Sequence, residues 1–481
     1  MTLSIPNHQT YTIYWAVIGL VVGLSIVTLP NIMSLLLIGT ISLGIFFLLE
    51  PTLAFVVLLF IAPMKTLLET ELAINFPLDV GQLSFVVAIG VWGIRRLHLK
   101  KRFPTPFQIP IFNAVLFFLA TTLLTIPNAI SVGAAINEWL KWVEILVLIY
   151  VLNDQRLIRW QWLVIALILV GVSQAIVGIY QFQGGSGAPH LWILDHQYFR
   201  AFGTFGQPNP FGAFMGLILP LSLGVSWGLF ITAWQQRTFS NIVLAIGSFS
   251  ASGILLLGLL VSWSRGAWIG FAAASLAMLW VLPSKRWQGT MLIIGTIILG
   301  SILYSSGQLP SQISDRVLNF TEDFTGFRDV RGAPINDDNY AVVERLAHWQ
   351  SALAMATDHL WLGVGFGNYE AAYKDYALIN WPEALGHAHN YYLNLLAETG
   401  ILGLSAYLIM WGLIFSATYR PISMTSGWQR GIIIGLVGVW VHLAVHSLVD
   451  KLYVNNIFLH IGVLFGVLGI LHNRSKQAEE I

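Results

Sequence analysis

The sequence of 481 residues contains no cysteine and few charged residues. Without cysteine the chain can form no disulfide, no thiolate metal site and no cysteine nucleophile. Charged residues make up 10% of the chain, whereas soluble proteins usually carry roughly 25%. The net charge is +1, so bulk electrostatics gives no attraction to nucleic acid and we expect no nucleic-acid partner.

Long apolar runs take the place of the missing charge. Hydrophobic residues make up 56% of the chain, and about fourteen apolar segments recur along it, most of them long enough to cross a bilayer. Because the third and fourth are short or weak, we predict an all-α polytopic membrane protein with about 12–14 transmembrane helices in one domain, residues 1–481. The segments centre near residues 21, 40, 58, 89, 118, 143, 170, 220, 252, 275, 297, 409, 439 and 463.

The distribution of lysine and arginine predicts an orientation. With the N-terminus inside, most basic residues fall in cytoplasmic connections, as the positive-inside rule requires. The start of the chain lacks the basic region of a cleaved signal peptide, so the first apolar run is predicted to remain a membrane helix and both termini to be cytoplasmic. Residues 307–385 then form one long extracytoplasmic loop, in which "NYAVVERLAHWQSALAMATDH" has the pattern of an amphipathic helix.

The stretch "GHAHNYYLNLLAETGILGL", residues 386–404, is the most polar segment directly before an apolar run. Helical spacing predicts an amphipathic helix at the outer surface that Gly400 ends. The polar side of this helix either faces water or forms a functional site. His389 lies near the start of the segment, outside the polar side of the helix. It suits the role of general base because the ordinary pKa of histidine lies near 6.5. The polar stripe consists of His387, Asn390, Asn394 and Glu398.

Three arginines stand on the predicted outer side. Arg265, in "SWSRGAW", either reaches to the membrane surface or holds an anion in an outward cavity, since a guanidinium suits phosphate oxygens. Arg345, in "VVERLAHWQ", is a solvated charge unless the long loop folds back over the membrane domain. Arg200 lies in the outer connection "YFRAFGTFGQPNPFGAF".

Further polar or glycine-rich segments can be interpreted either as structural or as functional. The glycines of "GVGFGNYEAAY" predict a tight turn before a short helix, although their amides could also approach an anion. The thirteenth segment carries His442, His446 and Asp450 at spacings of i, i+4 and i+8, which places them on one face of a helix. Such a face either makes hydrogen bonds to a neighbouring helix or lines a cavity. On the sixth segment, the charged side chains lie three residues apart and are predicted to neutralise one another. They are Glu138, Lys141 and Glu144.

A metal site is a further interpretation of the two histidines. His387 and His389, with Glu398 and Asp450, are residue types that could supply ligands. No H-E-x-x-H pattern supports such a site, and we predict none.

The order of these motifs resembles that of the O-antigen ligase and O-antigen polymerase family over about residues 196–470. "RAFGTFGQPNPFGAF" and "SWSRGAW" come first, the long loop carries "RLAHW" and "GVGFGN", and "HAHNYYLNLLAETGILG" follows. The last piece is the most specific, because the family pattern resembles H-N, nine residues, then G-x-x-G. Here His389 and Asn390 precede Gly400 and Gly403.

The resemblance implies a bacterial plasma-membrane glycosyltransferase of GT-C type fold that acts on the outer side without metal or other cofactor. Its donor would be a glycan on polyprenyl (undecaprenyl) diphosphate, with His389 as general base and Arg265 and Arg345 holding the diphosphate. Arg200 is a third candidate for the diphosphate. The supporting positions are His387, Asn390, Glu398, Gly400, Gly403, His446 and Asp450.

Several activities remain open within and beyond the family. A ligase would transfer a polysaccharide to a lipid-A-core sugar, a polymerase would join repeats on the lipid carrier, and protein O-oligosaccharyltransferases also belong to the family. The motif spacing favours the ligase. A solute transporter, of bicarbonate for example, is the alternative from another class, because polar stripes in membrane helices also suit a solute path.

Overall fold

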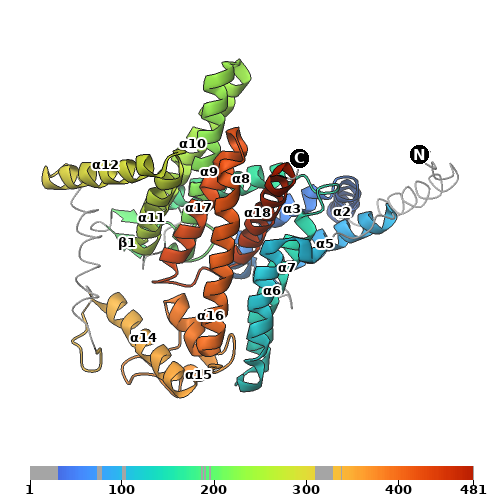
Figure 1. Ribbon diagram of the computed structural model, residues 1–481. Helices are drawn as coiled ribbons and strands as arrows, with labels where there is room; N and C mark the ends of the chain where they lie inside the picture. Colours follow the sequence, from blue (N-terminus) through green and yellow to red (C-terminus); the bar gives the residue numbers. More distant parts are fainter. Residues whose placement is uncertain are drawn as a thin grey trace.

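The computed structural model is a bundle of helices (Figure 1). Among the residues described, ten helices are long and apolar enough to span a membrane, and Gly39–Leu49 and Arg265–Val281 are shorter apolar helices. The predicted all-α polytopic membrane protein is therefore confirmed. The structure describes residues 31–72, 79–99, 105–185, 188, 191–193, 197–308, 329–336 and 339–479.

Thirteen of the predicted apolar segments coincide with helices, and the one near residue 21 lies outside the described residues. The helices that match these segments are α2 (Asn31–Leu49), α3 (Thr52–Ile61), α5 (Val80–His98), α6 (Pro110–Leu123), α7 (Val132–Leu152), α8 (Trp160–Phe182), α9 (Pro208–Gln236), α10 (Phe239–Val261), α11 (Arg265–Val281), α12 (Arg286–Ser305), α16 (Tyr391–Tyr419), α17 (Gly427–His446) and α18 (Ile457–Glu479). The other α-helices and strands of the described residues are α4 (Lys65–Leu72), α14 (Tyr340–Asp358), α15 (Tyr369–Tyr373) and the antiparallel pair β1 (Trp192–Ile193) and β2 (Tyr198–Phe199).

Helices α9 and α17 form the centre of the bundle, and glycines allow their close approach. A Cβ on Gly224 would collide with the carbonyl of Gly431, and a Cβ on Gly431 would collide with that of Gly224. Small residues at a crossing let the backbones of membrane helices pack closely. Nearer the other end of α17, His442 fits against Gly216 of α9 and Gly270 of α11.

The long loop folds back onto the helical bundle. The predicted amphipathic helix is present as α14, which packs against α16 (Figure 1). Its buried side includes Val342, Val343 and Met355. Residues 309–328 of this loop lie outside the described residues.

Two predicted helix boundaries are wrong. The helix expected from His387 begins at Tyr391, because Asn390 caps it with an extended backbone. Asp450 does not continue the stripe on α17, since that helix ends at His446 and a turn follows. Gly400 does interrupt α16, with a φ of 62° and a ψ of −166°.

Candidate active site

His389 lies in a tightly held loop immediately before α16. The Oδ1 of Asn390 accepts hydrogen bonds from the backbone N–H groups two and three positions further on, at 3.0 and 3.1 Å. The N–H of Tyr391 donates to the carbonyl of Ser447 at 2.8 Å. These bonds surround a His389 backbone with a φ of 51°, a conformation that costs energy for a residue with a Cβ. The fold therefore holds the histidine in one strained position.

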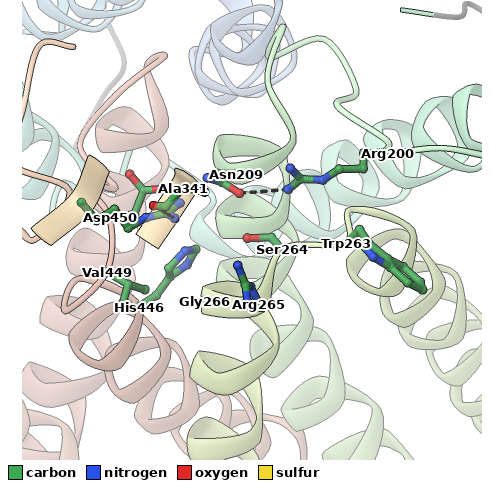
Figure 2. Close-up of a pocket in the computed structure, with 11 residues that line it drawn as sticks. Arg200, Asn209, Trp263, Ser264, Arg265, Gly266, Ala341, His446, Val449 and Asp450 are labelled. Atoms are coloured by element: carbon green, nitrogen blue, oxygen red, sulfur yellow. Dashed lines mark hydrogen bonds between the residues drawn. The ribbon is translucent and has the colours of Figure 1, made fainter. Parts of the chain in front are cut away.

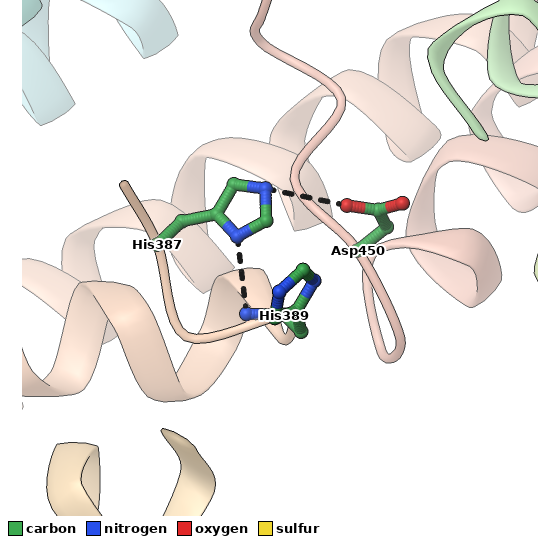
Figure 3. Close-up of side chains that lie close together, drawn as sticks. All are labelled: His387, His389 and Asp450. Carbon is green, nitrogen blue, oxygen red and sulfur yellow. Dashed lines mark hydrogen bonds and ion pairs between the residues drawn. The ribbon is translucent and has the colours of Figure 1, made fainter. Parts of the chain in front are cut away.

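A chain of polar contacts, one of them a hydrogen bond, leads from Asp450 to the backbone of His389 (Figure 3). The backbone N–H of His389 donates to His387 Nδ1 at 3.3 Å, and His387 Nε2 lies 3.4 Å from Asp450 Oδ1. Because Nδ1 accepts a hydrogen bond, the proton of a neutral His387 is on Nε2, facing the carboxylate. This chain positions His389 through its backbone and leaves the imidazole of His389 available.

The same three side chains are close enough together to suggest a metal site. Single ligand atoms of His387, His389 and Asp450 all lie within 4.8 Å of one another. Histidine ligands usually donate their second N–H to an acceptor, but the second nitrogen of His387 is itself an acceptor from a backbone N–H. The arrangement therefore favours a chain of polar contacts over a metal centre.

The His389 imidazole is kept neutral by its surroundings. Burial lowers its pKa to about 2, and the charges of Arg345 and of protonated His387 and His348 act in the same direction. Its two ring nitrogens are buried and have no hydrogen-bond partner among the described residues. A neutral imidazole with a free lone pair is the form that accepts a proton.

The three arginines predicted from separate segments meet at one cavity of about 120 Å³, here called the arginine cavity (Figure 2). Arg200 comes from the connection before α9, Arg265 begins α11, and Arg345 lies on α14. The rest of the lining includes Asn209, Ser264, His446 and Asp450. Because the loop folds back, Arg345 lines this cavity and is half-buried.

The arginine cavity is strongly electropositive. Burial lowers the pKa of Arg200 to about 10, and the charges of Arg345 and Arg265 add to the effect. Arg200 Nη2 donates to Asn209 Oδ1 at 3.1 Å, and Arg345 Nη1 donates to the Ala341 carbonyl at 2.8 Å. Arg345 Nε is buried with no partner among the described residues. An anion bound here would relieve the repulsion between the cations.

A larger cavity of about 770 Å³, here called the histidine cavity, contains His387 and His389 in its wall. It borders the arginine cavity, since Asn209 and Asp450 line both. Its other polar lining residues carry charges of both signs or none, among them Asn137, Glu138, Lys141, Gln207, Glu370 and Lys451. Such a lining offers both donors and acceptors to a polyhydroxylated molecule.

Lys451 also lines the histidine cavity, which the sequence did not predict. It is buried, and its Nζ lies 3.0 Å from Glu138 Oε1, while Lys141 Nζ lies 2.7 Å from Glu138 Oε2. The predicted neutralisation on α7 is therefore present for Glu138 and Lys141, with a second cation from the turn after α17. A single lysine in a short connection between two apolar segments gave no sign of this role.

Glycines of the two sequence motifs allow the long loop to pack closely against α16. A Cβ on Gly400 would collide with the backbone of Trp361, and a Cβ on Gly363 with that of Glu398. The N–H of Tyr369 donates to Glu398 Oε1 at 3.2 Å. Glu398 and Gly400 therefore hold the loop that carries Arg345, and "GVGFG" forms the predicted turn, with positive φ at its three glycines.

Several aromatic residues near the two cavities are buried or already hydrogen-bonded. Tyr391 is fully buried in an aromatic cluster with Tyr407 and Tyr453, and Trp381 is 6% exposed. Trp349 instead donates its Nε1–H to the carbonyl of His389 at 3.4 Å.

The fold and the two cavities define a polytopic helical membrane protein with a polar site at one end of α16 and α17. Residues 250–408 match the family model described as O-Antigen ligase. The match supports, over this region, the resemblance to the O-antigen ligase and polymerase family that was seen in the sequence. No curated protein matches the chain.

Proposed function

We propose that the protein transfers a glycan from a polyprenyl diphosphate carrier to a hydroxyl of an acceptor sugar, without metal and with inversion, as an O-antigen or polysaccharide ligase in the bacterial plasma membrane. The observation that carries the proposal is the meeting of three arginines beside a cavity that contains a neutral, strained histidine. A polymerase of the same family would use the same chemistry with a different acceptor.

The leaving diphosphate would occupy the arginine cavity. Negative charge grows on the diphosphate as the glycosidic bond breaks, and guanidinium groups fixed in advance stabilise that charge most in the transition state. Arg200, Arg265 and Arg345 come from different parts of the fold, so they can surround the diphosphate from several sides.

The acceptor would occupy the histidine cavity with its hydroxyl against His389. The imidazole takes the hydroxyl proton while the oxygen attacks the anomeric carbon, and the diphosphate leaves with the bonding electron pair. Because the charge of Arg345 contributes to the low pKa of His389, bound diphosphate would offset that charge and raise the basicity of the imidazole. The donor would thus activate the base.

A deletion strain tests the proposal directly. Wild type, His389→Gln and the control His359→Gln, an exposed histidine at the end of α14, are returned to the strain, and its glycans are separated on a gel. We expect wild type and the control to restore the polysaccharide and His389→Gln to fail at equal expression.

The species that accumulates identifies the activity. Long chains left on the carrier indicate a ligase, and single repeats on the carrier indicate a polymerase. A glycan pattern unchanged by the deletion would contradict the transferase and direct attention to solute uptake. Against transport, the polar side chains discussed above gather at one end of α17.

A further inference from the structure

A second polar cavity lies at the opposite end of α17. His446, the last residue of this helix, lines the arginine cavity, whereas Gly427, its first residue, lines a separate cavity of about 470 Å³. The helix has 20 residues and therefore separates the two by roughly 30 Å. The lysine and arginine distribution predicts this end to be cytoplasmic, so we name it the inner cavity.

The inner cavity combines one cation with neutral hydrogen-bonding groups. Arg430 Nη2 donates to the Leu282 carbonyl at 3.1 Å, which fixes the guanidinium, while its Nε is buried and has no partner among the described residues. No aspartate or glutamate is among the lining residues that the structure describes. The neutral polar groups include Thr232, Gln235, Gln236, Ser284 and Ser426.

One part of the inner cavity is apolar. Trp227 and Ile231 of α9 line it together with Leu282 and Pro283 from the end of α11. A site with a fixed guanidinium, amide and hydroxyl donors and an apolar wall suits a ligand that joins a phosphate to a less polar group.

We propose that the inner cavity binds a phosphate-bearing ligand through Arg430. The guanidinium would pair with the phosphate oxygens, Gln235 and Ser284 would donate further hydrogen bonds, and Trp227 would contact the apolar part. The same chemistry fits the headgroup of an anionic phospholipid and a soluble phosphate ester. The proposal does not depend on the transferase function, because the site shares no lining residue with either outer cavity.

The experiment uses the full chain in nanodiscs of phosphatidylcholine, with and without phosphatidylglycerol, and counts retained lipids by native mass spectrometry. Arg430→Gln is compared with Arg430→Lys, which keeps the charge, and with Arg237→Gln, an exposed arginine near the same end that does not line the inner cavity. We expect Arg430→Gln to lower phosphatidylglycerol retention about tenfold, as loss of a charged hydrogen bond does. Arg430→Lys should retain most binding, and Arg237→Gln should match wild type.

A second measurement distinguishes a phospholipid from a soluble phosphate ester, and a second variant guards against misfolding of Arg430→Gln. Thermal melting in detergent with added inorganic phosphate detects a soluble ligand, since a ligand that binds only the folded state raises the melting temperature. Gln235→Glu keeps the size of a side chain in the lining and adds a negative charge, so it should also weaken binding. The proposal is overturned if neither phosphatidylglycerol nor phosphate is preferred, or if Arg430→Gln and Arg237→Gln respond equally.

Discussion

The arginine cavity and the histidine cavity are neighbours with different chemistry. The smaller, of about 120 Å³, is surrounded by three arginines, whereas the larger, of about 770 Å³, has a lining of mixed charge and the two loop histidines. Asp450 lines both, and its Oδ1 lies 3.4 Å from His387 Nε2. In the proposed reaction, the two cavities correspond to a leaving-group side and an acceptor side, joined at the carboxylate of Asp450.

The largest effect is expected on the acceptor side. Replacing His389 by Gln removes the proton acceptor while keeping a polar side chain, so kcat should fall about 10²–10⁴-fold. Binding of the lipid-linked donor should stay close to that of wild type, because the arginines are untouched. Turnover and donor binding are measured on purified protein in nanodiscs, with His359→Gln as control. Turnover near the wild-type value would rule out His389 as the base.

On the leaving-group side, Arg345→Gln should lower kcat/KM for the donor about 10²–10³-fold, since a preorganised charge next to the diphosphate is lost. Arg345→Lys should recover part of this, because the charge remains but the planar fork does not. Arg331→Gln is the matched control, an exposed arginine of the same loop paired with Asp329 at 2.7 Å. If Arg345→Gln leaves both kcat and kcat/KM for the donor near the values of the Arg331→Gln control, the assignment of the diphosphate to the arginine cavity fails.

The junction between the cavities should give a smaller effect. His387→Phe removes the acceptor of the His389 backbone N–H and should lower kcat roughly tenfold, the size of one well-placed hydrogen bond. Asp450→Asn keeps an oxygen that accepts from His387 Nε2 and should be milder than Asp450→Ala. Steady-state kinetics checks the order. Equal losses in both Asp450 variants would show that charge, not positioning, is its contribution.

The pH dependence sharpens the comparison because the two sides are coupled by charge. The pKa of His389 is lowered to about 2 in the free protein, so the neutral base persists as pH falls through about 6.5, where an ordinary histidine becomes protonated. The profile of kcat/KM, which reports the free enzyme, should therefore show no histidine limb there. The profile of kcat reports the donor complex, in which the basicity of His389 is raised. As pH falls, kcat should therefore begin to decrease at a higher pH than kcat/KM does. A kcat/KM limb near 6.5 that disappears in His389→Gln would contradict this.

The sequence predicted the helices well because a bilayer demands apolar runs of about twenty residues, whatever their packing. It did not reveal how Arg200, Arg265 and Arg345 meet, since that depends on the loop folding back over α16. The helix start was misplaced because helical spacing continued from His387, although Asn390 is a capping residue type that favours a helix beginning after it. The role of Lys451 required its contact with Glu138 on a distant helix.

The smallest expected effect is that of removing divalent metal ions, and it tests the chain from Asp450 to His389. If this chain is a positioning device, EDTA should leave turnover within about twofold of its untreated value, because His387 Nδ1 is already an acceptor from a backbone N–H and the arginines supply the charge that a metal would otherwise provide. Added zinc should inhibit, by competing for the lone pair that His389 uses as a base. Loss of activity in EDTA, with recovery on adding one particular ion, would instead make His387, His389 and Asp450 a metal centre, and the arginine cavity would then share the stabilisation of the leaving group with that ion.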